Sequence, residues 1–122
     1  MILADTSVWI DHFRKPNARL QQLVEGGRMC NHPFVTGELA AGSLHVRHHM
    51  IQNLRALPHL EPVLEDTFYA FLEQSCLNGI GLGFVDLHLL AAVSARPGHS
   101  LWSRDVRLRD SAMSLGLGFQ PE

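Results

Sequence analysis

Short runs of apolar residues are spaced along this chain and separated by longer segments with helical periodicity. Such runs are typical of strands buried in a parallel sheet, which lack the alternation of half-exposed strands. The first run, residues 2–4, ends abruptly at Asp5. Pro62 counts against one of the later runs, because proline cannot donate to a strand ladder. We expect strands at residues 2–4, 28–32 and 100–103, and weaker ones at 60–64 and 118–119.

Between these runs, apolar residues recur every three or four positions, which predicts amphipathic helices. Capping residues and helix breakers mark several of their ends, such as Asp5-Thr6-Ser7 before the first helix and Gly26-Gly27 after the second. The expected helices are residues 8–13, 16–26, 33–41, 47–57, 66–77, 85–95 and 105–115. The alternation of strands and helices predicts a single α/β domain over residues 1–122 with a mostly parallel sheet.

Composition narrows the classes of protein to which the chain can belong. Hydrophobic residues make up 46% of it, which is ordinary for a folded domain. The formal net charge is −2, so contact with nucleic acid would need a local basic patch. Cys30 and Cys76 form no metal-binding spacing and are expected to be free thiols. We see no signal peptide and no membrane-spanning stretch, and therefore expect a cytoplasmic protein with no membrane contact.

Two local features do not predict sites of their own. The glycines of residues 79–83 do not have the spacing of a dinucleotide-binding motif, and we expect a flexible loop there. His45 and His49 could share a helical face, but no third ligand is near them in the sequence, so we do not expect a zinc site.

Two aspartates, Asp5 and Asp105, each follow an expected strand and precede an expected helix. Open α/β sheets bind their ligands just beyond the carboxyl ends of the strands, so both positions are candidates for a functional site. Aspartate is also a favoured N-cap residue, and capping alone would explain either position. Both roles can coexist on one carboxylate.

Two further acids, Glu38 and Asp86, lie inside expected helices with apolar neighbours one turn away on the same face. A charge on a core-facing stripe must be paired, bound to a metal ion or placed at the mouth of the core. Pairing with an arginine is the alternative to a functional role at each position. If all four acids converge, their mutual repulsion destabilises the fold unless a cation neutralises it.

A hard divalent cation is the natural partner for such a set of oxygens. Mg²⁺ and Mn²⁺ are held by few protein carboxylates and several waters, and their open positions can take a phosphate oxygen and an attacking water. A metal ion also lowers the pKa of bound water and stabilises developing negative charge. This chemistry favours hydrolysis of a phosphodiester.

Four segments resemble PIN-domain ribonucleases, and more narrowly the VapC toxins of bacterial toxin–antitoxin pairs. The opening is the most specific of them, and the others match through their order and spacing. They are residues 2–14 (ILADTSVWIDHFR), 36–39 (TGEL), 86–92 (DLHLLAA) and 103–105 (SRD). Residues 46–83 carry no diagnostic motif. The resemblance implies a PIN-like three-layer α/β/α fold with a mostly parallel central sheet.

The resemblance also implies roles for individual residues. Asp5, Glu38 and Asp86 would ligate the metal directly or through water, and Asp105 would complete the acidic pocket. Thr6 and Ser103 would hold the carboxylates with their hydroxyl groups. Asp110 is a rival for the fourth acid, but it lies within the expected last helix, away from a strand end.

By the same resemblance, the activity would be endonucleolytic cleavage of RNA (tRNA, rRNA or mRNA) with Mg²⁺, for which Mn²⁺ could substitute. The protein would be a toxin, often a homodimer, silenced by a cognate VapB-type antitoxin.

Arginines beside Asp105 could guide an RNA backbone toward the metal, and Arg104 and Arg107 are the candidates. A solvated helix face is the alternative for them. Two other functions remain open for the whole chain. A phosphoacceptor domain of the receiver type is also a small α/β unit with Mg²⁺, but here no acid pair precedes the first helix, and the sole lysine is Lys15. A PIN-fold binding module without turnover would have the same sequence features.

Overall fold

The computed structural model describes residues 1–42 and 48–121. Its sheet has three parallel strands, β1 (Ile2–Ala4), β2 (Met29–Cys30) and β3 (Ser100–Trp102), in the order β2-β1-β3. β1 is central and pairs with both neighbours, with Leu3 opposite Cys30 on one side and Leu101 on the other. Because all strands are parallel, their carboxyl ends lie at one edge of the sheet.

Isolated bridges extend the sheet beyond these strands. One joins Leu101 to Gly118, where we expected a weak strand. The other joins Asn31 to His59, and Leu60 N donates to Asn31 O at 2.8 Å. The expected strand at 60–64 is wrong, because residues 61–64 have no regular structure and contain Pro62.

Seven helices lie within the described residues, close to the predicted positions. α2 begins later than expected, at Ala18, because Asn17 rather than Pro16 caps it by accepting from Leu20 N at 3.0 Å. The first residue of the expected 47–57 helix lies outside the described residues, as does His45. The helices are α1 (Thr6–Arg14), α2 (Ala18–Glu25), α3 (Pro33–Ala41), α4 (His48–Arg55), α5 (Glu65–Ser75), α6 (Phe84–Ser94) and α7 (Val106–Ser114).

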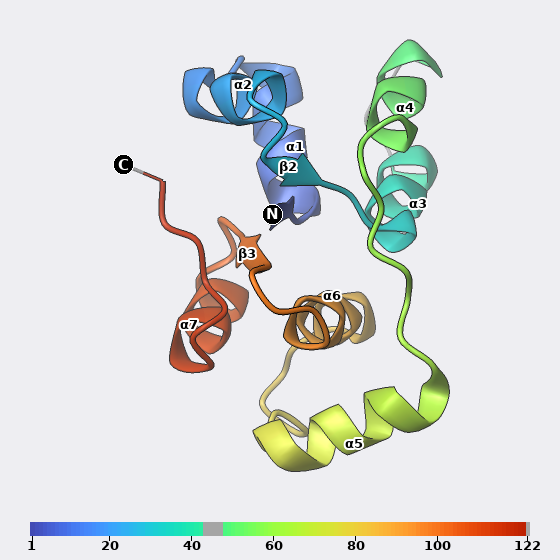
Figure 1. The fold of residues 1–122 in the computed structure, drawn as a ribbon, viewed down its shortest axis with the longest axis vertical. Helices are drawn as coiled ribbons and strands as arrows, with labels where there is room; N and C mark the ends of the chain where they lie inside the picture. Colours follow the sequence, from blue (N-terminus) through green and yellow to red (C-terminus); the bar gives the residue numbers. More distant parts are fainter. Residues whose placement is uncertain (43–47, 122) are drawn as a thin grey trace.

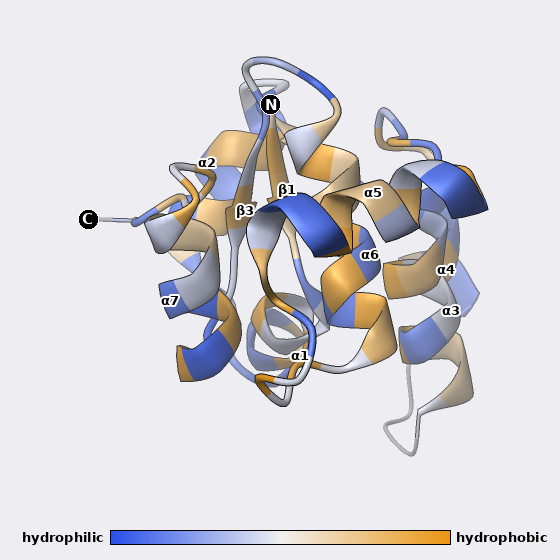
Figure 2. Ribbon diagram, turned by 90° about the horizontal axis from the view of Figure 1, so that it is seen from below, coloured by the Kyte–Doolittle hydropathy of each residue, from blue (hydrophilic) through white to orange (hydrophobic). Residues whose placement is uncertain are grey.

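Helices surround the short sheet (Figure 1). α6 and α7 pack against β3, α1 packs against β1 and α3, and α4 and α5 lie further out on α3 and α6. In Figure 2, α7 shows both hydrophobic and hydrophilic residues, as expected of a helix that buries Leu108 and Ala112 and exposes its other face. The fold class is the predicted one, α/β with a parallel sheet, and it is compatible with a PIN-like fold.

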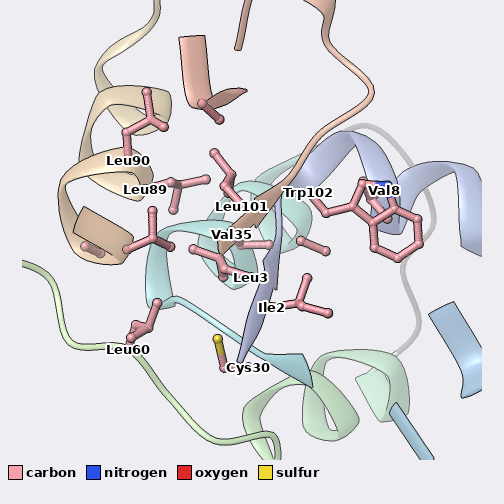
Figure 3. Packing of buried hydrophobic residues seen from close by; sticks show 14 of the residues in the cluster. Ile2, Leu3, Val8, Cys30, Val35, Leu60, Leu89, Leu90, Leu101 and Trp102 are labelled. Carbon is pink, nitrogen blue, oxygen red and sulfur yellow. The ribbon is translucent and has the colours of Figure 1, made fainter. Parts of the chain in front are cut away.

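The core draws buried residues from the sheet and from every helix, and α6 is the helix with the most. Six consecutive residues of α6, from His88 to Val93, are buried, so this helix is apolar on nearly all sides. Figure 3 shows Leu89 of α6, Leu101 of β3 and Val35 of α3 gathered around Leu3 of β1. This packing fixes the ends of β1, β3 and α6 relative to one another, and these ends carry three of the four candidate acids. No helix within the described residues has the length and apolar composition needed to cross a bilayer.

Candidate active site

Asp5 lies at the carboxyl end of β1 and is the N-cap of α1. Its Oδ1 accepts hydrogen bonds from Val8 N at 3.3 Å and from the Ser7 hydroxyl at 2.5 Å, and its Oδ2 accepts from the Ser103 hydroxyl at 2.6 Å. The side chain is buried, which raises the pKa of Asp5, and these hydrogen bonds partly offset the increase. The capping role anticipated as an alternative is therefore present, within a set of donors that fixes both carboxylate oxygens.

Ser103 links the ends of β1 and β3. Its hydroxyl donates to Asp5 and accepts from Asp105 N at 3.0 Å. Asp105 in turn caps α7, because its Oδ1 accepts from Leu108 N at 3.1 Å. The two strand-end aspartates are thus held through a single buried serine.

Glu38 reaches the same edge from α3. The Thr6 hydroxyl donates to Glu38 Oε1 at 2.7 Å, which ties α3 to the first residue of α1. Glu38 is exposed, and the buried residues of α3 are Val35, Thr36 and Leu39. The expectation that Glu38 lies on the apolar face of its helix is therefore wrong.

Asp86 occupies the first turn of α6 and is half-buried. Its pKa is raised to about 6, first by burial and then by the negative charges of Asp5, Asp105 and Glu38. The fold therefore brings the other three predicted acids within electrostatic range of Asp86.

No arginine among the described residues forms an ion pair with these four acids, which we call the acidic centre (Asp5, Glu38, Asp86 and Asp105). Among the described residues, the ion pairs formed by arginine join Arg104 to Asp11 and Arg109 to Asp110. The alternative in which arginines pair with Glu38 and Asp86 is thus not supported in the described part of the chain. The acids keep a repulsion that a bound cation would relieve.

A hollow of about 650 Å³ opens beside Asp86 and Asp105. One wall is the glycine-rich segment expected to be a flexible loop, where Gly81 O accepts from Arg107 Nη1 at 3.3 Å. Asp110, the rival for the fourth acid, also lines this hollow. The charges that raise the pKa of Asp86 do not include that of Asp110, which instead lies 3.7 Å from Arg109 Nε.

The two arginines predicted to guide RNA point to different places. Arg107 lies over the glycine-rich wall of the hollow. Arg104 lies beside α1, where its Nε contacts Asp11 Oδ2 at 2.5 Å and its backbone N donates to the Ser7 hydroxyl at 3.0 Å.

Sequence reasoning missed two residues of this site. Ser7 donates to Asp5 and accepts from Arg104 N, and Asp11 holds the Arg104 side chain. The position of Ser7 two residues after Asp5 is typical of a local hydroxyl–carboxylate contact and could have identified it. Nothing local to Asp11 indicates a partner more than ninety residues away.

The donor chemistry of the acidic centre suits a hard cation. Among the described residues, no three His, Cys, Asp or Glu side chains lie close enough to hold one ion directly. Mg²⁺ is commonly held by one or two carboxylates, with waters completing its octahedron, so it does not need three carboxylates as direct ligands. Asp86 and Asp105 border the open hollow, whereas both oxygens of Asp5 accept hydroxyl hydrogen bonds.

Comparison with known proteins gives the family of this chain. No family model matches it. Two curated proteins, both named Ribonuclease VapC32 and from the CDC 1551 and H37Rv strains of Mycobacterium tuberculosis, are each 38% identical to it over 122 residues. The alignment covers 100% of this chain and 98% of each relative. At this identity and coverage, the chain belongs to the VapC family of PIN-domain ribonucleases.

Proposed function

We propose that this chain is a Mg²⁺-dependent endoribonuclease, the toxin of a toxin–antitoxin pair. The single observation that carries the proposal is the acidic centre, where the charges of three carboxylates act on Asp86 and the described residues place no arginine against the four. Its place at the carboxyl edge of a parallel sheet is where open α/β domains bind ligands. The names of the relatives support RNA as the substrate.

The residues of the site have different proposed roles, which follow from their positions. Asp5, Glu38 and Asp86 would hold Mg²⁺, directly or through water, and Mn²⁺ should substitute because it prefers the same oxygen ligands. The bound ion would supply a water of lowered pKa and stabilise charge on the phosphate oxygens. Ser7 and Ser103 keep the carboxylate of Asp5 in one orientation, and Thr6 does the same for Glu38. At pH 7, above its pKa of about 6, Asp86 is mostly ionised and ready to bind a cation.

RNA would approach along basic side chains on both sides of Asp105. Arg107 borders the hollow that contains Asp86, and Arg104 borders α1. We keep both as RNA-binding residues. Because Arg107 is exposed and donates only one hydrogen bond to the loop among the described residues, it can also contact a phosphate in the hollow.

Protein partners follow from the family. We propose a VapB-type antitoxin that silences the site. A homodimer is supported by apolar side chains exposed around α5 and the start of α6, where Leu64 is 79% exposed, Tyr69 56% and Phe84 64%. A cytoplasmic location stays a prediction.

Asp5→Asn tests the proposal, because asparagine keeps the cap of α1 and removes the charge. We expect the parent, freed from antitoxin, to cleave RNA with Mg²⁺ or Mn²⁺ and to lose cleavage on chelation. The variant should be at least about 100-fold slower, since even indirect metal partners are worth 10–100-fold. Asp66→Asn, an exposed acid in the first turn of α5, is the matched control and should cleave like the parent.

Two alternatives make different predictions. Family membership removes the receiver-type phosphoacceptor, and acetyl phosphate should accordingly leave the protein unmodified. The PIN-fold binding module without turnover predicts RNA binding with no metal-dependent cleavage of any cellular RNA. Such a result with antitoxin-free protein would overturn the proposed activity.

A further inference from the structure

Two further hollows share Arg104 as a lining residue, and Arg107 lines neither of them. The first, of about 590 Å³, is lined by Arg14, Lys15, Arg19 and Arg104. The second, of about 500 Å³, is lined by Arg104 and Arg109 together with Phe119. Arg104 lines both, so the two hollows are neighbours on either side of this side chain, and we call them together the basic groove. In Figures 1 and 2 the C-terminal segment runs from α7 along the side of the molecule that carries α2.

The groove concentrates positive charge in a chain that is negative as a whole. The protein has ten lysines and arginines against twelve aspartates and glutamates, and five of the ten line the groove. The acid among the lining residues of these two hollows is Asp11, which contacts Arg104. A polyanion near this face therefore meets a field opposite to that of the rest of the protein.

The groove begins next to the acidic centre. The backbone N of Arg104 donates to the Ser7 hydroxyl, which itself donates to Asp5, so one hydroxyl separates the groove from the carboxylate. Asp11 fixes the Arg104 side chain from the next turn of α1. The far end lies at the C-terminus of α1, which has nine residues, or about 13 Å of helix. This length exceeds one nucleotide and suits an extended strand.

We propose that the basic groove holds the sugar–phosphate backbone of the RNA strand on one side of the cleaved bond. This inference rests on the proposed function and names how that site takes its substrate. Four carboxylates repel an approaching polyanion, and cations beside them offset this repulsion until the scissile phosphate reaches the metal. An RNA strand carries charge at regular intervals and so can use cations spread over the whole groove. An acidic segment of an antitoxin is the competing occupant.

The test removes the far end of the groove and leaves Arg104, which contacts the site, in place. The variant Arg14→Gln/Lys15→Gln/Arg19→Gln loses three charges. The control Arg28→Gln/Arg55→Gln/Arg96→Gln loses the same number at exposed positions outside both hollows. Circular dichroism and thermal unfolding check that both remain folded.

We expect the groove variant to raise KM for a long single-stranded RNA by about tenfold or more, with a smaller rise for the shortest RNA that is cleaved. The slope of log affinity against log salt should fall by about 2, because each single-strand phosphate contact contributes about 0.7. The control should keep the KM and kcat of the parent. Restoring charge with Arg14→Lys/Lys15→Arg/Arg19→Lys should recover most of the affinity.

Anisotropy with labelled RNA in the Asp5→Asn background separates this inference from the proposed function. If the parent cleaves nothing yet the groove variant loses RNA affinity, the activity fails and the groove stands. If the parent cleaves RNA and the groove variant matches the control in KM and salt slope, the groove inference is overturned. A groove variant that binds RNA normally but no longer binds the antitoxin overturns it as well, and assigns the groove to the antitoxin.

Discussion

Two regions of the protein contain titratable side chains whose pKa values burial has shifted, and the shifts have opposite directions. One is the acidic centre. The other, which we call the imidazole–aromatic cluster, packs between α3, α5 and α6 and consists of His32, Phe34, Phe68, Phe84 and His88. The His88 ring stacks on Phe68 with centroids 3.9 Å apart, and Phe34 lies edge-on to both imidazoles at 4.9 and 5.3 Å.

Burial acts on both groups through the same physical cause, because it disfavours whichever form is charged. It lowers the pKa of His32 to about 4, with smaller contributions from His88 and His59, and it raises the pKa of Asp86 to about 6. At pH 7 His32 is therefore neutral, and the desolvation of its charge costs nothing. Asp86 is ionised at the same pH beside three other acids.

The two regions therefore lower the stability of the fold in different ways. Each imidazole has one unsatisfied nitrogen, since His32 Nε2 and His88 Nδ1 are buried without a hydrogen-bond partner among the described residues. His32 nevertheless caps α3, because its Nδ1 accepts from Phe34 N at 3.0 Å. Asp86 instead keeps its charge at pH 7 beside the other acids, which is a cost that the proposed cation would offset.

The largest expected effect comes from neutralising Asp86. Asp86→Asn should lower the rate of RNA cleavage at least about 100-fold, as expected for a metal partner. It should also raise the melting temperature in EDTA at pH 8, by roughly 3 °C for a domain of this size, because it removes a repelled charge. Mg²⁺ should stabilise the parent and not the variant. Activity and melting temperature are measured on the same preparations.

The control for this prediction is Asp110→Asn, which removes an acid that lines the same hollow but is paired with Arg109. It should leave the response to Mg²⁺ unchanged. If Asp86→Asn destabilises the protein in EDTA, its carboxylate contributes to folding and the contrast between the two regions is lost.

The second expected effect is a pH dependence of opposite sign in the two regions. The folded pKa of His32, about 4, lies below the ordinary 6.5, so the unfolded chain binds more protons and stability is lost as pH falls from 6.5 toward 4. The loss amounts to at most about 3 kcal/mol. The folded pKa of Asp86 lies above 3.8, so its contribution is present at low pH and lost as pH rises through about 6.

Urea unfolding between pH 4 and 7 separates these contributions. In the Asp86→Asn background, the free energy of unfolding should rise more steeply with pH, because the opposing contribution of Asp86 is removed and that of His32 remains. His32→Asn should flatten this rise, because asparagine can replace the cap of α3 without titrating. Stability that stays constant over this range in the Asp86→Asn background, where the opposing contribution of Asp86 is absent, would contradict the assignment of a buried neutral imidazole at position 32.

The sequence predicted most of the positions of the acidic centre, and the predictions that were wrong have physical causes. Asp5 and Asp105 were identifiable because apolar runs end at them, and in a parallel sheet such ends share one edge. Glu38 was placed on the wrong face, because α3 is rich in small and apolar residues all around, so helical spacing defines no stripe there.

Tertiary contacts account for what the sequence did not show. The segment after α4 joins the sheet at His59 and Leu60 through backbone contacts with Asn31. The apolar pattern of residues 60–64 had predicted a strand a few residues too late. The surroundings of His32 and His88 depend on aromatic rings from three helices. Local sequence patterns do not show which partners these two imidazoles meet.

The smallest expected effect tests whether the imidazole–aromatic cluster is separate from the site despite sharing α6 with Asp86. His88→Phe keeps a ring against Phe68 and removes the buried nitrogen that has no partner among the described residues. Stability should rise by about 1 kcal/mol, since an unsatisfied buried polar group costs about 1–3 kcal/mol. RNA cleavage should stay within about threefold of the parent, because the substitution changes no hydrogen bond of the acidic centre.

His88→Ala is the matched control for packing, and it should destabilise the protein by about 3 kcal/mol through the cavity left beside Phe68. Urea unfolding and initial rates with excess Mg²⁺ give both quantities. A His88→Phe protein that is stable but as inactive as Asp86→Asn would show that the imidazole takes part in the reaction. The two regions would then be parts of one site, because a folded protein with an intact acidic centre would have lost its activity through a single buried nitrogen.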